Sequence, residues 1–276
     1  MTAAPTPAQA LSRATCALFV PGDRPERFDK AAATGALVVV DLEDAVAPAA
    51  KAQARENVRR WLADGVRAAV RINAVGTPWH ADDLAMVSTV ECVVMVAKAE
   101  AATLPAVVGA LPPASAVVAL VETAAGIRDA HQIAATDGVG RLAFGSYDLA
   151  AELGVDPVHR PALDPYRSTL VLASAAAGLP APLDGVTGAV GDEALLADDT
   201  RHARALGFGG RLCIHPRQVP VVAAGFAPTA AELEWARRVM AVVGAGGVST
   251  LDGQMVDAPV AQRARRLLAL AGVGDD

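Results

Sequence analysis

The chain has 276 residues, of which 53% are hydrophobic and only 4% aromatic, and its formal net charge is -6. This length suits one large α/β domain or two small ones, and a core with so few aromatic rings must be built from Ala, Val and Leu. The net negative charge argues against a nucleic-acid backbone as the main partner.

Residues 101–121 carry no charged side chain and therefore need to be checked as a membrane span. Pro105, Pro112 and Pro113 interrupt the stretch, which indicates a helix, a turn and a strand rather than a membrane-spanning helix. The three cysteines form no Cys-x-x-Cys pair. We expect them to be reduced, in a cytoplasmic protein that contacts no membrane.

Residues 1–13 are rich in Pro, Ala and Thr and predict a flexible leader. From residue 14 the chain alternates between short apolar runs and helical segments. Eight strands are expected at 14–20, 36–40, 67–72, 92–97, 117–121, 141–144, 180–183 and 211–214. The clearest helices between and after them are expected at 26–33, 51–63, 79–87, 124–135, 164–177 and 193–206.

Eight strand–helix units in a row predict a (β/α)8 TIM barrel over residues 14–228, since this fold commonly needs about 250 residues. A doubly wound open sheet is the alternative, but it more often has five or six strands. No G-x-G-x-x-G sequence follows the first strand, which disfavours a dinucleotide-binding fold.

Residues 229–276 exceed what the eight units need. Thr229 and Glu232 have the spacing of a capping box, and a helix is expected at 232–243. A glycine-rich turn from Gly244 to Gly247 and a last helix at 260–271 follow. We expect this helical extension to act as a lid or as an oligomer element.

Charged and polar residues gather where the predicted strands end. Because the carboxyl ends of parallel strands share one face of a barrel, we expect a functional site there. The residues concerned are Arg24, Glu43, Asp44, Arg71, Asn73, Lys98, Glu122, Asp148, Asp184 and His215.

Glu122 and Asp148 follow neighbouring strands and allow two interpretations. Two carboxylates with substrate oxygens and waters suit octahedral Mg2+, but acids at strand ends also cap helix N-termini. Arg71 suits a substrate carboxylate held by two hydrogen bonds, or an internal ion pair with Glu43 or Asp44. Both roles are compatible in one arginine.

Glu43 and Asp44 form an acidic cluster with Asp41 that could hold metal-bound waters or orient Arg71 and Lys98. Lys98 could act as the Schiff-base nucleophile of a class I aldolase, and the competing role is that of a charge partner for nearby acids. His215 could be a base or a structural histidine.

Several segments, taken together and in order, resemble the HpcH/HpaI aldolase and citrate lyase β-subunit superfamily, and its stand-alone citrate lyase β-like members most of all. These segments run through nearly the whole chain. They are Pro21-Gly22-x-Arg24-Pro25-Glu26-Arg27-Phe28, Asp41-Leu42-Glu43-Asp44-x-Val46, Val70-Arg71-Ile72-Asn73, Leu120-Val121-Glu122-Thr123-Ala124-x-Gly126, Phe144-Gly145-x-x-Asp148-Leu149, Ile214-His215-Pro216-x-Gln218-Val219 and Gly253-x-Met255-Val256-Asp257-x-Pro259.

The resemblance implies a TIM barrel that uses Mg2+ to cleave or form a C–C bond beside a CoA-thioester carbonyl. Malyl-, citramalyl- or citryl-CoA would give a short acyl-CoA and a 2-keto acid. Glu122 and Asp148 match the family's metal ligands, and Arg71 matches the arginine that binds the acid's carboxylate. Asp257 matches a lid aspartate, an acid/base candidate that reaches a neighbouring subunit's site, so the resemblance also implies a homotrimer or hexamer.

Two alternatives keep the same resemblance. One is a malyl-CoA-type thioesterase or malate synthase-like activity at the same site, and the other is a non-catalytic subunit that docks an acyl-carrier protein.

Two positions depart from the family pattern. Ala97 stands where Pro precedes the lysine in the family, and Tyr147 is bulkier than expected beside Asp148, which bears on substrate preference. Arg24 and Lys30 are candidates for CoA phosphate contact.

Overall fold

The computed structural model describes residues 5–66, 68–243 and 249–272. These residues form two compact units, one ending at Gly225 and the other beginning at Phe226. Four predictions reach residues outside the described ones: residues 1–4 of the leader, Arg67 in the third strand, the whole turn from Gly244 to Gly247, and residues 273–276 of the C-terminal extension.

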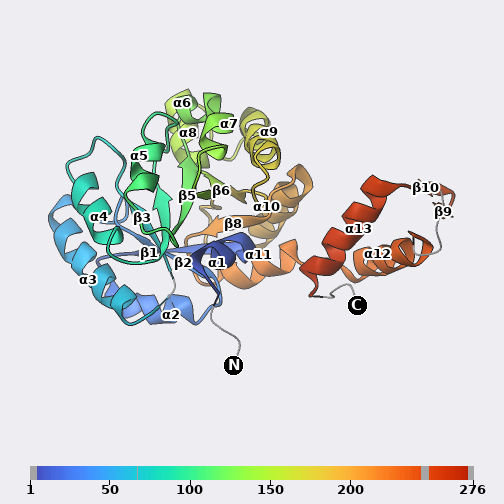
Figure 1. Cartoon of the computed structure of the whole chain (residues 1–276), viewed down its shortest axis with the longest axis horizontal. Helices are drawn as coiled ribbons and strands as arrows, with labels where there is room; N and C mark the ends of the chain where they lie inside the picture. Colours follow the sequence, from blue (N-terminus) through green and yellow to red (C-terminus); the bar gives the residue numbers. More distant parts are fainter. Residues whose placement is uncertain (1–4, 67, 244–248, 273–276) are drawn as a thin grey trace. The chain divides into compact units, whose positions relative to one another are not determined.

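Eight parallel strands close into a barrel in the first unit, in chain order, with the last strand beside the first (Figure 1). The strands are β1 (Cys16–Pro21), β2 (Leu37–Asp41), β3 (Ala69–Ile72), β4 (Val93–Val96), β5 (Ala116–Val121), β6 (Val139–Phe144), β7 (Leu183–Asp184) and β8 (Gly210–Cys213). The predicted (β/α)8 barrel is confirmed. Its strands all present their carboxyl ends on one face.

One helix precedes the first strand, and the others follow the strands around the barrel (Figure 1). They are α1 (Pro7–Arg13), α2 (Phe28–Ala32), α3 (Lys51–Ala63), α4 (His80–Val87), α5 (Leu104–Gly109), α6 (Ala124–Arg128), α7 (Ala130–Ala134), α8 (Ser146–Leu153), α9 (Arg160–Ala176), α10 (Glu193–Leu206) and α11 (Gln218–Phe226), with 3-10 turns η1 (Pro25–Arg27) and η2 (Pro48–Ala50). The helices predicted at 51–63 and 193–206 have the bounds of α3 and α10. The region 101–121 holds α5 and β5, as the prolines indicated.

The flexible leader predicted over residues 1–13 needs correction, because its second half forms α1. Thr6 and Gln9 make a capping box, with Gln9 N donating to Thr6 Oγ1 at 3.2 Å and Thr6 N donating to Gln9 Oε1 at 2.9 Å. Leu11 is buried in the barrel core, and its carbonyl accepts from Arg141 Nη1 at 2.9 Å. The Thr-x-x-Gln spacing was the sequence signal for this helix.

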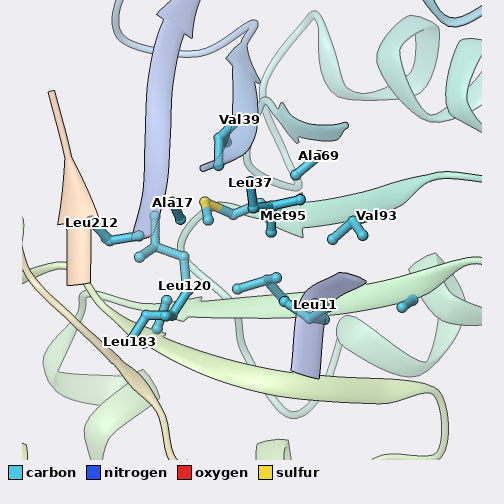
Figure 2. Packing of buried hydrophobic residues seen from close by; sticks show 13 residues of the cluster. Leu11, Ala17, Leu37, Val39, Ala69, Val93, Met95, Leu120, Leu183 and Leu212 are labelled. Atoms are coloured by element: carbon cyan, nitrogen blue, oxygen red, sulfur yellow. The ribbon is translucent and has the colours of Figure 1, made fainter. Parts of the chain in front are cut away.

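Inward-facing side chains of the strands, together with Leu11 of α1, form one apolar cluster (Figure 2). Its members are Leu11, Ala17, Leu37, Val39, Ala69, Val93, Met95, Ala116, Val118, Leu120, Ala143, Leu183 and Leu212. All but Met95 are Ala, Val or Leu, as the composition predicted. Because side chains alternate along a strand, the next inward positions after Val39 and Ala69 are Asp41 and Arg71, at the carboxyl ends.

The second unit is a helical hairpin with a small two-stranded sheet. It comprises α12 (Ala230–Val243), β9 (Ser249–Leu251), β10 (Gln254–Val256) and α13 (Ala258–Leu270). The predicted capping box is confirmed, with Glu232 N donating to Thr229 Oγ1 at 3.2 Å and Thr229 N donating to Glu232 Oε2 at 2.8 Å. Asp252 and Gly253 both have positive φ, 52° and 77°, as a two-residue hairpin turn requires.

None of the helices in the described parts of the chain is long and apolar enough to cross a membrane.

Candidate active site

A cavity of about 400 Å3, called here the mouth cavity, opens at the carboxyl ends of the strands. Its volume falls within the range of small-molecule sites. It is lined by the polar residues Asp41, Asp44, Arg71, Glu122, Ser146 and Asp148, by the apolar residues Phe19, Pro21, Leu120, Phe144, Val186, Leu212 and Ile214, and by Ala45, Gly145 and Tyr147. Asp44, Arg71, Glu122 and Asp148 are thus brought together, as the sequence predicted.

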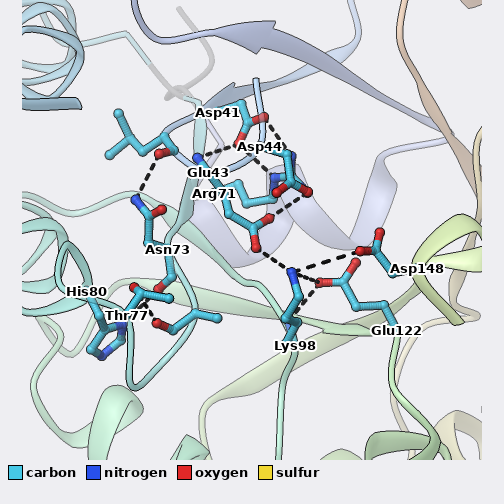
Figure 3. Close-up of polar contacts among 12 residues, drawn as sticks. Asp41, Glu43, Asp44, Arg71, Asn73, Thr77, His80, Lys98, Glu122 and Asp148 are labelled. Atoms are coloured by element: carbon cyan, nitrogen blue, oxygen red, sulfur yellow. Dashed lines mark hydrogen bonds and ion pairs between the residues drawn. The ribbon is translucent and has the colours of Figure 1, made fainter. Parts of the chain in front are cut away.

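Arg71 and Asp41 form a bidentate ion pair in the mouth cavity (Figure 3). Nε of Arg71 donates to Oδ1 at 2.7 Å and Nη2 donates to Oδ2 at 2.6 Å. The two residues are direct partners in the β2–β3 register, so the sheet itself sets this contact. Burial alone would lower the pKa of Arg71, but the hydrogen bonds and charge of Asp41 outweigh it and raise that pKa. The guanidinium therefore stays charged.

The third nitrogen of Arg71, Nη1, faces two further carboxylates. It lies 2.9 Å from Glu43 Oε2 and 3.7 Å from Asp44 Oδ2. Within the described residues the buried Oε2 has no hydrogen-bond partner, so the contact with Glu43 is an ion pair without hydrogen-bond alignment. Arg71 thus makes internal ion pairs with Asp41 and Glu43.

The chain after β2 folds back onto Asp41. Glu43 N donates to Asp41 Oδ1 at 2.9 Å, and Ala45 N donates to Asp41 Oδ2 at 3.0 Å. Each oxygen of Asp41 therefore accepts from the backbone and from Arg71. Asp41 fixes the arginine and the acidic loop in one arrangement, as expected of the acidic cluster, although its direct pairing with Arg71 was not predicted. The signal was its place at the end of a buried strand, level with Arg71.

Lys51, in the first turn of α3, anchors the same loop. Its Nζ donates to Leu42 O at 2.8 Å, Glu43 O at 2.9 Å and Asn73 Oδ1 at 2.8 Å. Asn73 Nδ2 also donates to Leu42 O at 2.8 Å, and Asn73 N donates to Asp83 Oδ2 at 2.9 Å. Burial lowers the pKa of Lys51. Lys51 and Asn73 thus hold the loop that carries Glu43 and Asp44 in place through its backbone carbonyls.

Glu43 pairs with Lys98, whose Nζ donates to Glu43 Oε1 at 2.7 Å. Burial raises the pKa of Glu43, and the charge of Arg71 offsets this only in part. Burial alone would lower the pKa of Lys98, but its hydrogen bond to Glu43 and the charges of the surrounding carboxylates outweigh burial and raise that pKa. A Schiff-base lysine needs a lowered pKa. The contacts of Lys98 are therefore those of a charge partner.

Glu122 follows β5 directly, and it is buried. Its Oε1 accepts from Lys98 N at 2.8 Å, and Lys98 has an unusual positive φ of 47°. Gly145 lies so close that a Cβ there would overlap the Glu122 side chain. Burial raises the pKa of Glu122 to about 8, and the charges of Glu43 and Asp148 add to this shift.

Asp148 lies in the first turn of α8, with its side chain 41% exposed. Lys98 Nζ is 4.0 Å from both Glu122 Oε1 and Asp148 Oδ1, so it bridges the two acids (Figure 3). The capping interpretation finds no support in these contacts. Thr123 Oγ1 caps α6 by accepting from Gly126 N at 3.0 Å, and α8 has no side-chain cap among the described residues.

Glu122 and Asp148 suit a hard divalent cation. In the part of the chain that is described, no group of three or more His, Cys, Asp or Glu residues is arranged to hold a metal, so the protein would supply only this pair. Mg2+ is commonly bound by one or two carboxylates, with waters and substrate oxygens completing its octahedron. Burial raises the pKa of Glu122, the charges of Glu43 and Asp148 add to the shift, and a bound cation would stabilise the ionised carboxylate. The residues therefore fit Mg2+.

Asp184 was expected on this face but lies elsewhere. It is buried, and it accepts from Arg167 Nε at 2.9 Å and from Arg211 Nη1 at 3.0 Å. Asp184 of β7 therefore forms internal ion pairs with one arginine in α9 and one in β8. It does not line the mouth cavity.

His215 and Lys30 line a second cavity of about 380 Å3 beside β1. Nδ1 of His215 accepts from Arg217 N at 3.2 Å, which orients the ring locally. Arg24 is exposed, and its Nε lies 3.8 Å from Asp23 Oδ1. None of these three predicted residues is among those that line the mouth cavity.

Asp257 belongs to the second unit, where it caps α13. Its Oδ1 accepts from Val260 N at 3.1 Å. The residue directly follows β10, at the end of the small sheet.

Comparisons with known proteins find relatives over nearly the whole chain. A model of the HpcH/HpaI aldolase/citrate lyase family matches residues 15–216. A citrate lyase subunit beta-like protein of Mycobacterium tuberculosis is 44% identical over 263 residues, covering 92% of this chain and 94% of the relative. A (3S)-malyl-CoA thioesterase of Cereibacter sphaeroides is 35% identical over 268 residues, covering 92% and 93%. Among solved structures, CitE from M. tuberculosis in complex with magnesium, acetoacetate and coenzyme A matches with a TM-score of 0.83 and 40% identity, covering 94% and 98%.

Proposed function

The chain belongs to the HpcH/HpaI aldolase/citrate lyase family, and from that premise we propose that it is a Mg2+-dependent carbon–carbon lyase. Its substrate is a hydroxy-dicarboxylic acyl-CoA of the malyl-, citramalyl- or citryl-CoA type. The products are a short acyl-CoA and a 2-oxo acid, and the reaction is reversible. A similar solved structure contains magnesium, a small oxo acid and coenzyme A together.

One observation carries the proposal. The carboxylates of Glu122 and Asp148 lie in the same cavity as the guanidinium of Arg71. A 2-oxo acid carries a carbonyl and a carboxylate on neighbouring carbons. Two acidic side chains can hold a metal ion that binds these oxygens, and an arginine can hold the carboxylate by hydrogen bonds. Mg2+ held by Glu122 and Asp148 would stabilise the negative charge that develops on the reacting oxygen.

Arg71 binds and orients the acid. Asp41 occupies its Nε and Nη2 groups, and Nη1 is the group proposed to meet the substrate carboxylate. Because Asp41 also accepts two backbone N–H groups, the arginine is held before the substrate arrives. Preorganised charges of this kind cost no rearrangement during the reaction.

Lys98 keeps the carboxylates in place. Its ammonium group is bonded to Glu43 and lies 4.0 Å from Glu122 and Asp148, so it reduces the repulsion among three acids. Glu43 in turn faces Arg71. Lys98 and Glu43 are therefore positioning residues in this proposal.

In the cleavage direction a base takes the proton of the substrate's hydroxyl group, and the bond between the second and third acyl carbons breaks. Its electron pair moves onto the thioester as an enolate, which is then protonated at the second carbon. Asp257 is the proposed acid/base, acting as a lid residue in the site of a neighbouring subunit of a trimer or hexamer.

Thioester hydrolysis is the second candidate, and the similarity to a (3S)-malyl-CoA thioesterase favours it. In that case water attacks the thioester carbonyl and the C–C bond stays intact. The same acid-binding residues would serve both reactions.

The test is product identification. The protein is incubated with Mg2+ and with malyl-, citramalyl- and citryl-CoA in turn, and the products are separated by chromatography. A lyase gives acyl-CoA and a 2-oxo acid, whereas a thioesterase gives free CoA and the hydroxy acid. Glu122→Gln, which keeps the side chain's size but removes its charge, should abolish the conversion.

A further inference from the structure

Lys98 brings one positive charge to three carboxylates (Figure 3). Its Nζ donates to Glu43 Oε1 at 2.7 Å, and it lies 4.0 Å from Glu122 Oε1 and 4.0 Å from Asp148 Oδ1. Glu122 and Asp148 are the two carboxylates that fit Mg2+. The ammonium group of Lys98 is therefore a second cation that faces the pair of acids assigned to the metal.

The backbone of Lys98 directs the residue toward Glu122. Lys98 has a positive φ of 47°, a left-handed conformation that residues other than glycine adopt at a cost. In this conformation Lys98 N donates to Glu122 Oε1 at 2.8 Å, the same oxygen that lies 4.0 Å from Nζ. The lysine side chain therefore begins beside the metal pair.

Glu43 holds the ammonium group in this place. The Glu43 side chain is only 7% exposed, and its Oε2, which lies 2.9 Å from Arg71 Nη1, has no hydrogen-bond partner among the described residues. If Lys98 turned into solvent, Oε1 of Glu43 would lose its hydrogen bond as well, and a buried carboxylate without hydrogen bonds is costly. Lys98 is therefore kept near Glu122 and Asp148.

The distances make the charge of Lys98 effective at the metal pair. Mg2+ binds its oxygen ligands at about 2.0–2.1 Å, so an ion on Glu122 Oε1 or Asp148 Oδ1 lies no more than about 6 Å from Nζ in this arrangement. Charges of the same sign repel strongly at this separation when the site is partly buried. The side chains of Lys98 and Glu122 are 37% and 2% exposed, so solvent screens the repulsion only in part.

The two acids are held by contacts that do not involve the ammonium group. The hydrogen bond from Lys98 N to Glu122 comes from the backbone, and Gly145 packs directly against the Glu122 side chain. Asp148 is fixed by its place in α8. Removing the lysine's charge therefore leaves both acids in position and makes them more negative, which favours a bound cation.

We propose that Lys98 is an internal competitor of the metal, and that its charge lowers the affinity of Glu122 and Asp148 for every divalent cation. The ammonium group reduces the repulsion between the acids, and a cation that takes over this role is itself repelled by the ammonium group. The inference rests on the proposed function for the metal assignment. It goes beyond that function, because it gives Lys98 control over how tightly the metal is held.

Four variants separate the charge of Lys98 from its other contributions. Lys98→Met removes the charge and keeps the length of the side chain, and Lys98→Gln removes the charge but keeps a donor for Glu43. Lys98→Arg keeps the charge and is the matched control. Lys30→Met removes the charge of a lysine that lines the second cavity, and it controls for the net charge of the protein.

The experiment is calorimetric titration of the full chain with MgCl2 and, separately, with CaCl2 at constant ionic strength. A pH of 9, above the pKa of Glu122, keeps protons from competing with the metal. Lys98→Met and Lys98→Gln are expected to bind Mg2+ about tenfold or more tightly than the wild type, whereas Lys98→Arg and Lys30→Met stay within about threefold. Thermal unfolding of each variant confirms that it is folded.

Calcium tests whether Lys98 acts through its charge. Ca2+ has the charge of Mg2+ but is larger and tolerates more flexible sites, so its affinity should rise in Lys98→Met by the same factor as that of Mg2+, within about twofold. A gain for Mg2+ that Ca2+ does not share would show a change in the geometry of the site and would overturn the inference.

Unchanged or weaker Mg2+ binding in folded Lys98→Met and Lys98→Gln also overturns it, because Lys98 would then support the ligands and not compete with the metal. Failure of the proposed function gives other results. Mg2+ binding that Glu122→Gln leaves unchanged, or no Mg2+ binding by the wild type and both neutral variants, overturns the metal site and this inference together. Tighter Mg2+ binding by Lys98→Met in a protein that cleaves no thioester supports the inference and contradicts the lyase.

Discussion

Asp41 and Arg71 meet side by side across β2 and β3, with N–O distances of 2.7 and 2.6 Å. The pair engages one edge of the guanidinium and leaves Nη1 without a hydrogen bond among the described residues. In the proposed function, Asp41 therefore leaves Nη1 as the group that meets the substrate carboxylate.

Asp41→Asn should weaken binding of the acid. The substitution keeps the side chain's size but removes the charge that orients Arg71, so the affinity for pyruvate is expected to fall by about tenfold or more. Calorimetry with Mg2+ present measures it. Asp184→Asn is the matched control, since it breaks another buried pair away from the cavity. Equal losses in both variants would show that the effect is on stability and not on Arg71.

Gly145→Ala should impair Mg2+ binding although glycine is no ligand. A Cβ at this position would overlap the Glu122 side chain and displace its carboxylate, and we expect the Mg2+ affinity to fall about tenfold or more. Gly109→Ala is the control, because a Cβ there meets nothing within 4 Å. Unchanged Mg2+ affinity in Gly145→Ala would contradict the place given to Glu122.

The pKa of Glu122 predicts how stability depends on pH in the absence of metal. Burial raises this pKa from 4.5 to about 8, so the folded state favours the protonated acid. The resulting stabilisation is fully present below about pH 4.5 and is lost as the pH rises to about 8. Denaturant titrations between pH 5 and pH 8.5 should show that the free energy of unfolding of Glu122→Gln increases relative to that of the wild type as the pH rises. A constant difference between the two proteins would contradict the raised pKa.

The same group predicts a pH-dependent Mg2+ affinity. Below about pH 8 the metal must displace a proton from Glu122, so the affinity should rise by as much as about tenfold per pH unit and then level off. Calorimetry in two buffers of different ionisation enthalpy would measure the released proton. No release at pH 6.5 would contradict the assignment of Glu122 as a ligand.

The proposed lid role of Asp257 predicts complementation between subunits. Asp257→Ala and Arg71→Ala should each be inactive alone. If a neighbouring subunit supplies Asp257, subunits mixed during refolding should recover about one quarter of the wild-type activity, because that fraction of sites combines an intact barrel with an intact lid. Thermal unfolding of Asp257→Ala separates this role from the loss of the α13 cap. No recovery in mixed oligomers would contradict the shared site.

Eight apolar runs with polar ends were sufficient to predict the barrel. It was harder to predict on which face of the sheet a strand-end side chain lies, because an error of one residue in the strand's position reverses the predicted direction of the side chain. The seventh strand was predicted at 180–183, with Asp184 following it. In the structure Leu183 points into the barrel core and Asp184, still in β7, points out to Arg167.

The site was predictable to the extent that its residues follow strands directly. Glu122, Asp148 and Arg71 line one cavity as expected. The Asp41–Arg71 pair was missed because the second strand was predicted to end at Val40, whereas β2 includes Asp41 and pairs it with Arg71. The role of Lys51 depends on two loop carbonyls, and no side-chain pattern in a sequence reveals such contacts.

The most direct test of the account is cleavage of citramalyl-CoA in D2O with Mg2+, followed by mass analysis of the products. Breaking the C–C bond leaves a thioester enolate that takes its proton from the solvent. The account therefore predicts acetyl-CoA that carries deuterium beside the thioester, together with pyruvate, and no conversion by Glu122→Gln. Free CoA with intact citramalate, or unreacted ester in a protein that binds Mg2+, would contradict it.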